Sequence, residues 1–431
     1  MVHYSPPFFT PFMDAYRNLV YDDTWNGRFR ARVFVFLADA FVVQLATAVK
    51  CQRSVRNAML SIHLITKPLS PPWNDSARNL PRYLVESASS VHFSIFTDRT
   101  QPTHLHPCTI HPVYSHASTP VLSHLNKMRI FYSLFSRYGM HQDIPRPNLF
   151  HAFFTPNRLS SAMFRFLRRW IPGIPCIQTV TATPECDADI DRLNGVDGII
   201  TLSRVTEHRI AQRIHRPIWM INPGVPDVDP LPRDQIQACR SRYVADTALL
   251  VLYPGDLFFS KCTSDLLQIA DMMRLRFPGS RLIVSNRVKT TEDTQTAIDL
   301  CHSGYPVIAV ADASESMPVL LSAADLVIFP IRSMHGKMDI PLVLIEAMAH
   351  GKPVIVSDFG PLKEVGETGG TIVYPCIDAH IGIDRIHELL QSREQLSLLG
   401  GRARDVYERR FTARRMAMQT EVVYREFAHE G

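Results

Sequence analysis

Short apolar runs alternate with longer amphipathic stretches along the chain from Met59 onward. Continuous apolar runs of this length are typical of strands that are buried on both faces of a parallel sheet. The strands that this pattern predicts are Ser61–Thr66, Val91–Thr97, Thr109–Val113, Leu149–Phe153, Cys176–Val180, Gly198–Leu202, Ile218–Ile221, Ala248–Tyr253, Arg281–Ser285, Pro306–Val310, Leu326–Phe329, Pro353–Val356 and Thr371–Tyr374. Since helical patterns separate them, the sequence predicts βα alternation and a mostly parallel, doubly wound arrangement.

A turn-rich segment at Asn222–Pro230 divides this alternation into two halves. We therefore predict an α/β fold of two Rossmann-like domains, residues 59–225 and 226–408, that face a cleft. Residues 409–431 are expected to form a C-terminal helix that packs back on the N-terminal domain. In such folds ligands bind outside the carboxyl ends of the strands, so the cleft is the expected site.

Residues 1–58 are expected to be an N-terminal extension that is not part of the core fold. Their most apolar stretch, Val33–Val49, has 17 residues, whereas a membrane-spanning helix needs about 20. Asp39 lies at its middle, where a charge is costly in a bilayer. Three alternatives stay open for this stretch: a membrane anchor, a buried or docked helix, and an extension outside the working fold.

Composition narrows the class of protein. Hydrophobic residues make up 46% of the 431 residues and charged residues 20%, which is globular composition. The net charge of +5, from 46 basic and 41 acidic residues, is far from that of a dedicated nucleic-acid binder. The 8 cysteines include no CxxC pair and no Cys/His cluster with zinc spacing. We therefore expect a reduced, cytoplasmic protein with no nucleic-acid partner.

The stretch from Leu326 to Val365 carries the most chemistry: LVIFPIRSMHGKMDIPLVLIEAMAHGKPVIVSDFGPLKEV. A buried strand leads into a polar loop, and Pro341 then suits the first turn of a helix. Helix N-termini at strand ends present free N–H groups and a positive dipole to anions. Asp339 and Glu346 are acceptors that suit hydroxyl groups of a ligand.

Within that stretch, EAMAHGKPVIVSDFGPLKEV resembles the donor-site signature of retaining GT-B glycosyltransferases of the group 1 or family 4 type. INPGVP at Ile221–Pro226, FHAF around His151 and GGTIVYP at Gly369–Pro375 resemble other segments of that family in the same order. The resemblance implies a glycosyltransferase that moves a sugar from a nucleotide-sugar to an unknown acceptor, which is a glycan, a lipid or a small molecule. It implies retention of configuration and no cofactor besides the nucleotide-sugar co-substrate. We expect no metal, because no DxD-like carboxylate pair lies at a strand end of the type that holds a divalent ion near a diphosphate.

The resemblance also assigns donor-binding residues. Glu346 matches the glutamate that binds the ribose hydroxyls, and Lys261 matches the lysine that holds the diphosphate. Gly360, Pro361 and Leu362 lie in the segment whose backbone amides approach the sugar and the phosphates. No side chain is an evident nucleophile, so the catalytic residue stays unassigned.

Two positions depart from the family pattern. The family glutamate that precedes Glu346 by eight residues is Met338 here, and the neighbouring Asp339 either reaches the sugar hydroxyls or caps the following helix. The family arginine that precedes Lys261 by five residues is Asp256, which cannot neutralise a diphosphate. Arg287 follows a neighbouring strand and is either the substitute cation or part of a solvent-facing loop.

The acceptor side is expected in the N-terminal half, where the resemblance is weaker. Asn74 and Asp75 lie in the first strand–helix loop, which lacks the glycines that the family often has there. Thr181 stands where the family has a histidine after a strand, and His151 is either a core or cleft-edge histidine or a catalyst.

Peripheral contact with the inner face of a membrane is a further open possibility. Basic and aromatic residues are interleaved at Lys127–Tyr138 and Phe164–Trp170. Such a face either lies on a membrane surface or combines an apolar core side with solvated arginines.

Two alternatives to a transferase stay open. The departures at Met338 and Asp256 suit a non-catalytic relative that binds a sugar nucleotide or a partner protein. A sugar-nucleotide epimerase of the same fold would change the sugar and leave the nucleotide attached. Consumption of the donor distinguishes the three.

Overall fold

A computed structural model describes residues 59–67, 69, 73, 75–98, 108–114, 133, 146–286, 290–311, 316–375 and 378–429. The chain divides into two compact units, Met1–Ala58 and Met59–Gly431, and every described residue belongs to the second. The predicted extension, with its apolar stretch Val33–Val49, therefore lies outside the described residues.

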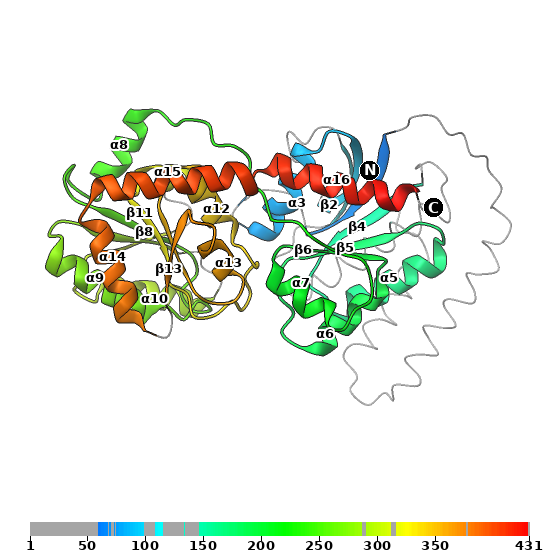
Figure 1. The fold of residues 1–431 in the computed structure, drawn as a ribbon, viewed down its shortest axis with the longest axis horizontal. Helices are drawn as coiled ribbons and strands as arrows, with labels where there is room; N and C mark the ends of the chain where they lie inside the picture. The colour runs from blue at the N-terminus through cyan, green and yellow to red at the C-terminus, as the bar shows by residue number, and fades with distance from the viewer. Residues whose placement is uncertain are drawn as a thin grey trace, which may run out of the picture. The chain divides into compact units, whose positions relative to one another are not determined.

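The N-terminal half is built on a seven-stranded parallel sheet (Figure 1). Its strands are β1 (Leu60–Ile65), β2 (Val91–Asp98), β3 (Cys108–Tyr114), β4 (Leu149–Phe153), β5 (Cys176–Val180), β6 (Gly198–Thr201) and β7 (Ile218–Met220). They lie in the order β3-β2-β1-β4-β5-β6-β7. The described helices of this half are α3 (Ser76–Ser87), α5 (Arg158–Trp170), the short α6 (Asp187–Asp191) with the 3-10 turn η1 (Arg192–Gly195), and α7 (Arg204–Ala211).

The C-terminal half has a six-stranded parallel sheet in the order β10-β9-β8-β11-β12-β13. Its strands are β8 (Leu250–Pro254), β9 (Arg281–Asn286), β10 (Val307–Ala311), β11 (Leu326–Phe329), β12 (Val354–Ser357) and β13 (Thr371–Tyr374). The helices that follow the linker are α8 (Arg233–Ser241), α9 (Thr263–Arg276), α10 (Thr291–Cys301), α11 (Met317–Ala323), α12 (Leu342–Ala349), α13 (Leu362–Gly366), α14 (Ala379–Leu390), α15 (Arg393–Arg410) and α16 (Ala413–His429).

Both sheets are doubly wound, as predicted. Strand order reverses between β1 and β4 in the first sheet and between β8 and β11 in the second. At such a switch point the loops leave the neighbouring strands in opposite directions, which makes room for a ligand at the carboxyl edge. In the C-terminal sheet this point brings together the loops that follow β8 and β11.

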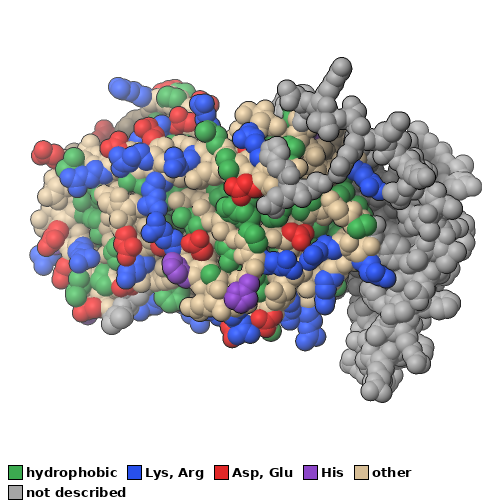
Figure 2. Space-filling view, turned by 45° about the vertical axis from the view of Figure 1, so that its right-hand side comes forward, with side chains coloured by type: hydrophobic (Ala, Val, Ile, Leu, Met, Phe, Trp, Pro, Cys, Tyr) green, Lys and Arg blue, Asp and Glu red, His purple; other side chains and the backbone are tan. Residues whose placement is uncertain are grey.

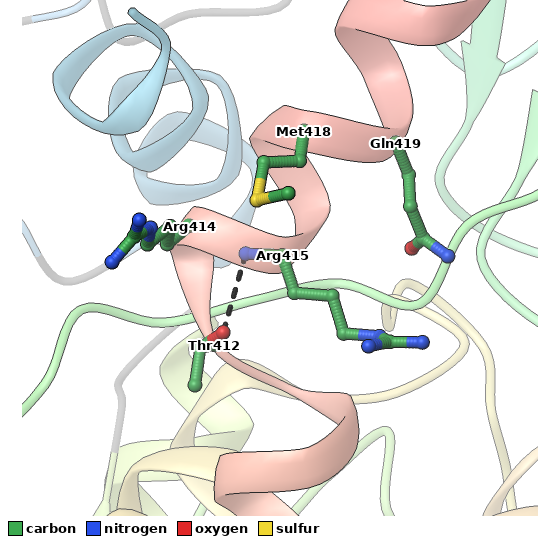
Figure 3. A pocket seen from close by; sticks show the side chains of 5 residues that line it. All are labelled: Thr412, Arg414, Arg415, Met418 and Gln419. Atoms are coloured by element: carbon green, nitrogen blue, oxygen red, sulfur yellow. Dashed lines mark hydrogen bonds between the residues drawn. The ribbon is translucent and has the colours of Figure 1, made fainter.

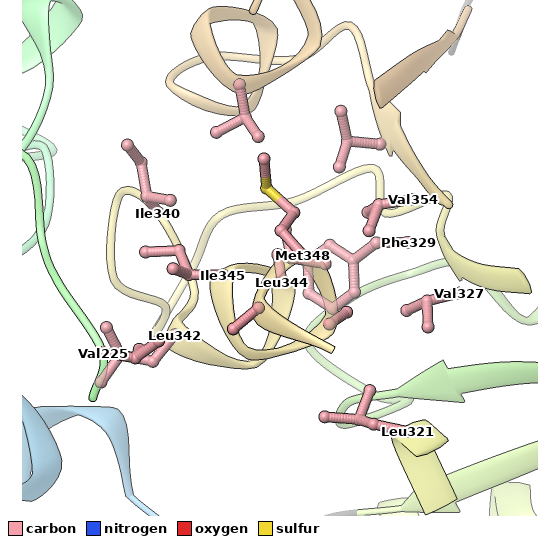
Figure 4. Close-up of a cluster of buried hydrophobic side chains, with 14 of the residues drawn as sticks. Val225, Leu321, Val327, Phe329, Ile340, Leu342, Leu344, Ile345, Met348 and Val354 are labelled. Carbon is pink, nitrogen blue, oxygen red and sulfur yellow. The ribbon is translucent and has the colours of Figure 1, made fainter. Parts of the chain in front are cut away.

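Helix α12 anchors the loop after β11 in the core of the C-terminal half. It is apolar on nearly every side, and 6 of its 8 residues are buried. Figure 4 shows Leu344, Ile345 and Met348 of this helix among buried strand side chains such as Val354. Burying one such side chain stabilises the fold by about 1.5–3 kcal/mol. The packing therefore fixes the position of Glu346, the helix's acidic residue.

The C-terminal helix α16 returns to the N-terminal half. It packs against α3, β1 and β4, and Figure 1 shows it in red beside them. Gly224 makes this return possible, because a Cβ there would lie 2.4 Å from the Thr412 carbonyl oxygen at the α15–α16 junction. Backbone hydrogen bonds join the same places, from Val225 N to Phe411 O at 3.0 Å and from Ala413 N to Val225 O at 2.8 Å.

Candidate functional site

The loop after β8, residues 255–262, is braced from two directions. The Tyr253 hydroxyl lies 2.6 Å from the Asp256 carbonyl oxygen and 2.8 Å from the Ser260 hydroxyl. The buried Asp293 carboxylate, at the start of α10, accepts from the backbone amides of Leu257 and Phe258 at 2.9 Å each. These contacts hold the backbone of the loop in one conformation.

Lys261 lies at the end of this loop in a left-handed conformation. Its φ of 54° makes it the one non-glycine residue with positive φ in the described part of the chain. The side chain is exposed, and α9 begins two residues later without a side-chain cap from Cys262. A left-handed conformation costs a residue with a Cβ about 1–2 kcal/mol. Such strain persists where the surroundings fix the backbone, and it is common at functional sites.

Asp256 is paired with a cation from the loop after β11. The Lys337 ammonium contacts the Asp256 carboxylate, and the two side chains are only 6% and 5% exposed. Two charges out of water are tolerated when they are paired and hydrogen bonded, and Ser260 N also donates to Asp256 at 3.1 Å. Lys337 was not among the predicted site residues, although a carboxylate soon after a buried strand indicates that a counter-charge is needed.

A second ion pair joins the loop after β11 to α9. The Arg332 guanidinium donates twice to the buried Asp265 carboxylate, from Nε and from Nη2, each at 2.7 Å. The Tyr374 hydroxyl donates to the same carboxylate at 2.9 Å. The loops after β8 and β11 are therefore tied together on both sides of Lys261.

Glu346 faces the N-terminal half. Tyr83 of α3 donates its hydroxyl to Glu346 Oε1 at 3.3 Å. Part of the Glu346 side chain keeps exposed surface, but its carboxylate lies among protein atoms, and this burial raises its pKa to about 7. The carboxylate already accepts from one hydroxyl group, which is the interaction that a ribose would offer.

Asp339 is bound by the N-terminal half. Its carboxylate accepts from Thr183 N at 2.7 Å, from Ser203 Oγ at 2.7 Å and from Thr206 Oγ1 at 2.6 Å. Burial raises the pKa of Asp339, and the hydrogen bonds from Ser203, Thr206 and Thr183 oppose that rise. Asp339 does not cap α12, whose N-cap is Pro341, and its carboxylate contacts the segments after β5 and β6 instead.

The segment from Gly360 begins α13. Gly360 has a φ of 52°, which favours glycine, and Pro361 caps the helix. Leu362 is buried in the core. Glu364 reaches the N-terminal half, where its carboxylate accepts from the backbone amides of Arg204 and Val205.

The acceptor-side candidates are spread over different environments. Asp75 caps α3 by accepting from Ala77 N at 3.0 Å. His151 is fully buried, within 2.6 Å of the Tyr424 hydroxyl and 2.7 Å of the Thr179 hydroxyl, and burial lowers its pKa to about 3. This geometry is that of a core histidine. The Thr181 carbonyl accepts from Asp339 N at 3.0 Å.

Three predictions concern residues that the structure does not describe. Asn74, Arg287 and the basic–aromatic stretch Lys127–Tyr138 lie outside the described residues, apart from Ser133 of that stretch. Nothing here tests them.

The surface adds one hollow and a mixed charge pattern. A hollow of about 240 Å³ is lined by Thr412, Arg414, Arg415, Met418 and Gln419 at the start of α16 (Figure 3). In the sequence, its lining residues lie outside the loops that follow β8 and β11. Figure 2 shows a face on which basic and acidic side chains lie interspersed. Among the described residues, no helix is both long and apolar enough to cross a membrane.

Part of the chain that contains these loops is similar to known proteins. Residues 251–392 match the family model described as "Glycosyl transferases group 1". An uncharacterized glycosyltransferase of Methanocaldococcus jannaschii is 28% identical over 213 residues, which cover 48% of this chain and 52% of that protein. The chain therefore matches about half the length of this curated relative. Lys261, Asp339, Glu346 and Gly360 all fall within the matched family segment.

Solved structures share the arrangement of both sheets. Sucrose-phosphate synthase from Thermosynechococcus elongatus superposes with a TM-score of 0.66 at 18% identity, covering 86% of this chain and 100% of that chain. HepE of Anabaena, in complex with UDP and glucose, gives 0.62 at 15% identity, covering 85% and 99%. WaaG, a glycosyltransferase involved in lipopolysaccharide biosynthesis, gives 0.60 at 12% identity, covering 84% and 99%. At these identities the likeness establishes the fold.

Proposed function

We propose that this protein transfers a sugar from a nucleotide-sugar to an acceptor. The premise is that residues 251–392 match the group 1 glycosyl transferase family model and that the chain has a GT-B fold. The proposal includes retention of configuration and independence from a metal ion. The nucleotide-sugar is the co-substrate, and the acceptor is a glycan, a lipid or a small molecule.

The position of Lys261 and Glu346 carries this proposal. Both lie within residues 251–392, which match the family model. They follow β8 and β11, the two strands at the switch point of the C-terminal sheet, where ligands bind in doubly wound folds. Lys261 is held in a strained conformation with its ammonium exposed, and Glu346 keeps a buried carboxylate with a raised pKa. Perturbed groups of this kind cluster at functional sites.

The proposed chemistry is electrostatic. When the bond between the sugar and the diphosphate breaks, its electron pair stays on the diphosphate, whose negative charge grows. The exposed Lys261 ammonium and the free N–H groups at the start of α9 would stabilise that charge. Glu346 would accept hydrogen bonds from the ribose hydroxyls and so orient the donor. The acceptor hydroxyl forms the new bond to the sugar, and its proton passes to the departing diphosphate, which holds the electron pair of the broken bond.

Contact with a membrane surface is a further part of the proposal. Helix α5 exposes Arg158, Arg165, Arg168 and Arg169, while Arg168 also pairs with Asp197 at 3.3 Å. A basic helix of this kind would approach anionic lipid through its arginines. Co-sedimentation with vesicles that contain anionic lipid tests it, and equal recovery with neutral vesicles would contradict it.

A second candidate, a binder of sugar nucleotides without turnover, is favoured by two observations. Asp339, which stands beside the position of a family acid, is bound to the N-terminal half. Asp256 stands where the family has a cation and needs Lys337 for its own charge. Such a protein would bind the nucleotide through Lys261 and Glu346 and leave the sugar attached.

The test measures release of nucleoside diphosphate from a panel of nucleotide-sugars. UDP-glucose is the first choice, because the fold neighbour HepE was solved with UDP and glucose. A transferase hydrolyses its donor slowly even without acceptor, a binder does not, and an epimerase alters the sugar alone. Chelator is added to test metal independence. Loss of release in Lys261→Ala, with release kept in a variant of the exposed Glu367, would support the proposed site. No release and no nucleotide binding with any donor would refute it.

A further inference from the structure

Two carboxylates from the C-terminal half hold the N-terminus of α7, a helix of the N-terminal half. Asp339 comes from the loop after β11, and Glu364 comes from α13, which follows β12. We call this set of contacts the α7 clasp. It consists of Asp339 and Glu364 on one side and of Thr183, Ser203, Arg204, Val205 and Thr206 on the other.

The two carboxylates accept hydrogen bonds from different groups at the N-terminus of α7. Asp339 binds side chains, because Ser203 Oγ donates to its Oδ2 at 2.7 Å and Thr206 Oγ1 donates to the same oxygen at 2.6 Å. Glu364 binds the backbone, and the amides of Arg204 and Val205 donate to it at 3.0 and 2.7 Å. Amides in the first turn of a helix have no partner within the helix, and the helix dipole favours a negative charge there.

Asp339 also reaches the loop after β5. Thr183 donates to its Oδ1 twice, from N at 2.7 Å and from Oγ1 at 3.0 Å. The carboxylate is 1% exposed and therefore accepts four hydrogen bonds without competition from bulk water. A buried carboxylate in this state is costly to pull away from its partners, because it would be left with unpaired acceptors.

We propose that the α7 clasp positions the donor-side loops against the acceptor half, so that Asp339 and Glu364 are positioning residues for sugar transfer. This inference rests on the proposed function. The clasp fixes residues 333–341, which lead into the helix that carries Glu346, and residues 358–364, which include Gly360. Both segments would touch the donor, so their distance from the acceptor half sets the distance between sugar and acceptor. Displacement of reacting groups by about 1 Å can lower a rate about 100-fold.

Glu364→Ala and Asp339→Ala open the clasp from the C-terminal half. Thr206→Val opens it from the N-terminal half, because it removes the hydroxyl that donates to Asp339. This variant tests the clasp even if Asp339→Ala does not fold. Asp339→Asn is the conservative variant, because its amide oxygen still accepts from Thr183 N. Glu367→Ala is the matched control, since Glu367 lies at the end of the same helix α13 with an exposed side chain.

The first measurement does not depend on activity. Amide hydrogen exchange should accelerate at Arg204 and Val205 in Glu364→Ala and at Thr183 in Asp339→Ala, with Glu367→Ala unchanged. The second measurement is turnover with the donor that the full-length protein uses. We expect kcat to fall about 10- to 100-fold in Glu364→Ala and Thr206→Val, while the dissociation constant for the free nucleoside diphosphate changes by less than about threefold. Asp339→Asn should recover part of the loss.

Each outcome decides a separate statement. Unchanged amide exchange in the variants would overturn the clasp. Faster exchange with unchanged kcat would overturn the positioning role. A fall in nucleotide affinity as large as the fall in kcat would make these residues part of the nucleotide site instead. Absence of turnover in the unmodified protein would refute the proposed function, and the positioning role with it, while the exchange result would still decide whether the clasp exists.

Discussion

Replacement of Glu346 by glutamine should make the protein more stable and weaken its binding of nucleotide. Burial raises the pKa of Glu346 from 4.5 to about 7 in the folded protein, so the folded state holds this proton more tightly than the unfolded chain. The stabilising contribution is complete below pH 4.5 and is lost as pH rises through 7. Glutamine is nearly the same size, can accept from the Tyr83 hydroxyl, and carries no charge at any pH.

The size of the effect follows from the pKa values. One pKa unit corresponds to about 1.4 kcal/mol, so ionising Glu346 in the folded protein costs about 3 kcal/mol at pH 8. Glu346→Gln should therefore exceed the unmodified protein in free energy of unfolding by up to about 3 kcal/mol at pH 8. The two should be nearly equal at pH 4.5. Water at the exposed part of the side chain makes this value an upper bound.

Urea denaturation across pH 4.5–8 measures the difference, and Glu367→Gln, a substitution at an exposed position, serves as the control. If ribose hydroxyls donate to Glu346, they favour its ionised form. Calorimetry at pH 6.5 in two buffers of different ionisation enthalpy should then detect protons released on UDP binding. Glu346→Gln should release fewer protons, since only those of the UDP phosphate remain, and it should bind UDP more weakly by about 1.5–3 kcal/mol, the worth of a charge-assisted hydrogen bond. A constant stability difference between pH 4.5 and 8 would refute the burial argument.

Three further predictions follow from the same loops. Lys261→Gly should raise the free energy of unfolding by about 1 kcal/mol, because glycine adopts positive φ without strain, while UDP affinity by calorimetry falls; a destabilised variant would contradict the assigned strain. Lys337→Met should lower the free energy of unfolding, measured in urea, by about 3–5 kcal/mol, since it leaves the Asp256 carboxylate buried and unpaired. The double variant with Asp256→Asn should recover most of this loss, and a double variant as unstable as Lys337→Met would contradict the pairing argument. Removal of residues 1–58 should leave the melting temperature unchanged, and aggregation of the remaining chain would show that the extension covers an apolar surface.

The fold could be predicted from sequence where strands are mainly apolar. Leu149–Phe153, Cys176–Val180, Leu326–Phe329 and Thr371–Tyr374 have the same bounds in the prediction and in the structure. Each is a mainly apolar run next to turn-forming residues, so the signal begins and ends with the strand. Helix α8 was not predicted, because its sequence is mostly polar and Cys239 is its one buried residue.

The site could be predicted only as far as local sequence decides it. Glu346 and Gly360 stand in a recognisable segment, and their local backbone follows from the adjoining helix and turn. The partners of Asp339 are Thr183, Ser203 and Thr206, more than 130 residues earlier in the chain. No local pattern specifies such a contact, because it depends on how the two halves pack.

The energetics of the site argue for a ligand. Lys261 is held in a conformation that costs stability, and Glu346 carries a carboxylate that costs stability when ionised at neutral pH. The exposed Lys261 side chain makes no ion pair with the described residues, and Glu346 accepts from one hydroxyl group. A diphosphate would neutralise the lysine, and ribose hydroxyls would stabilise the carboxylate. A nucleotide would therefore gain an ion pair with Lys261 and hydrogen bonds to Glu346, whereas a surface that bound none would gain stability from glycine at position 261 and glutamine at position 346.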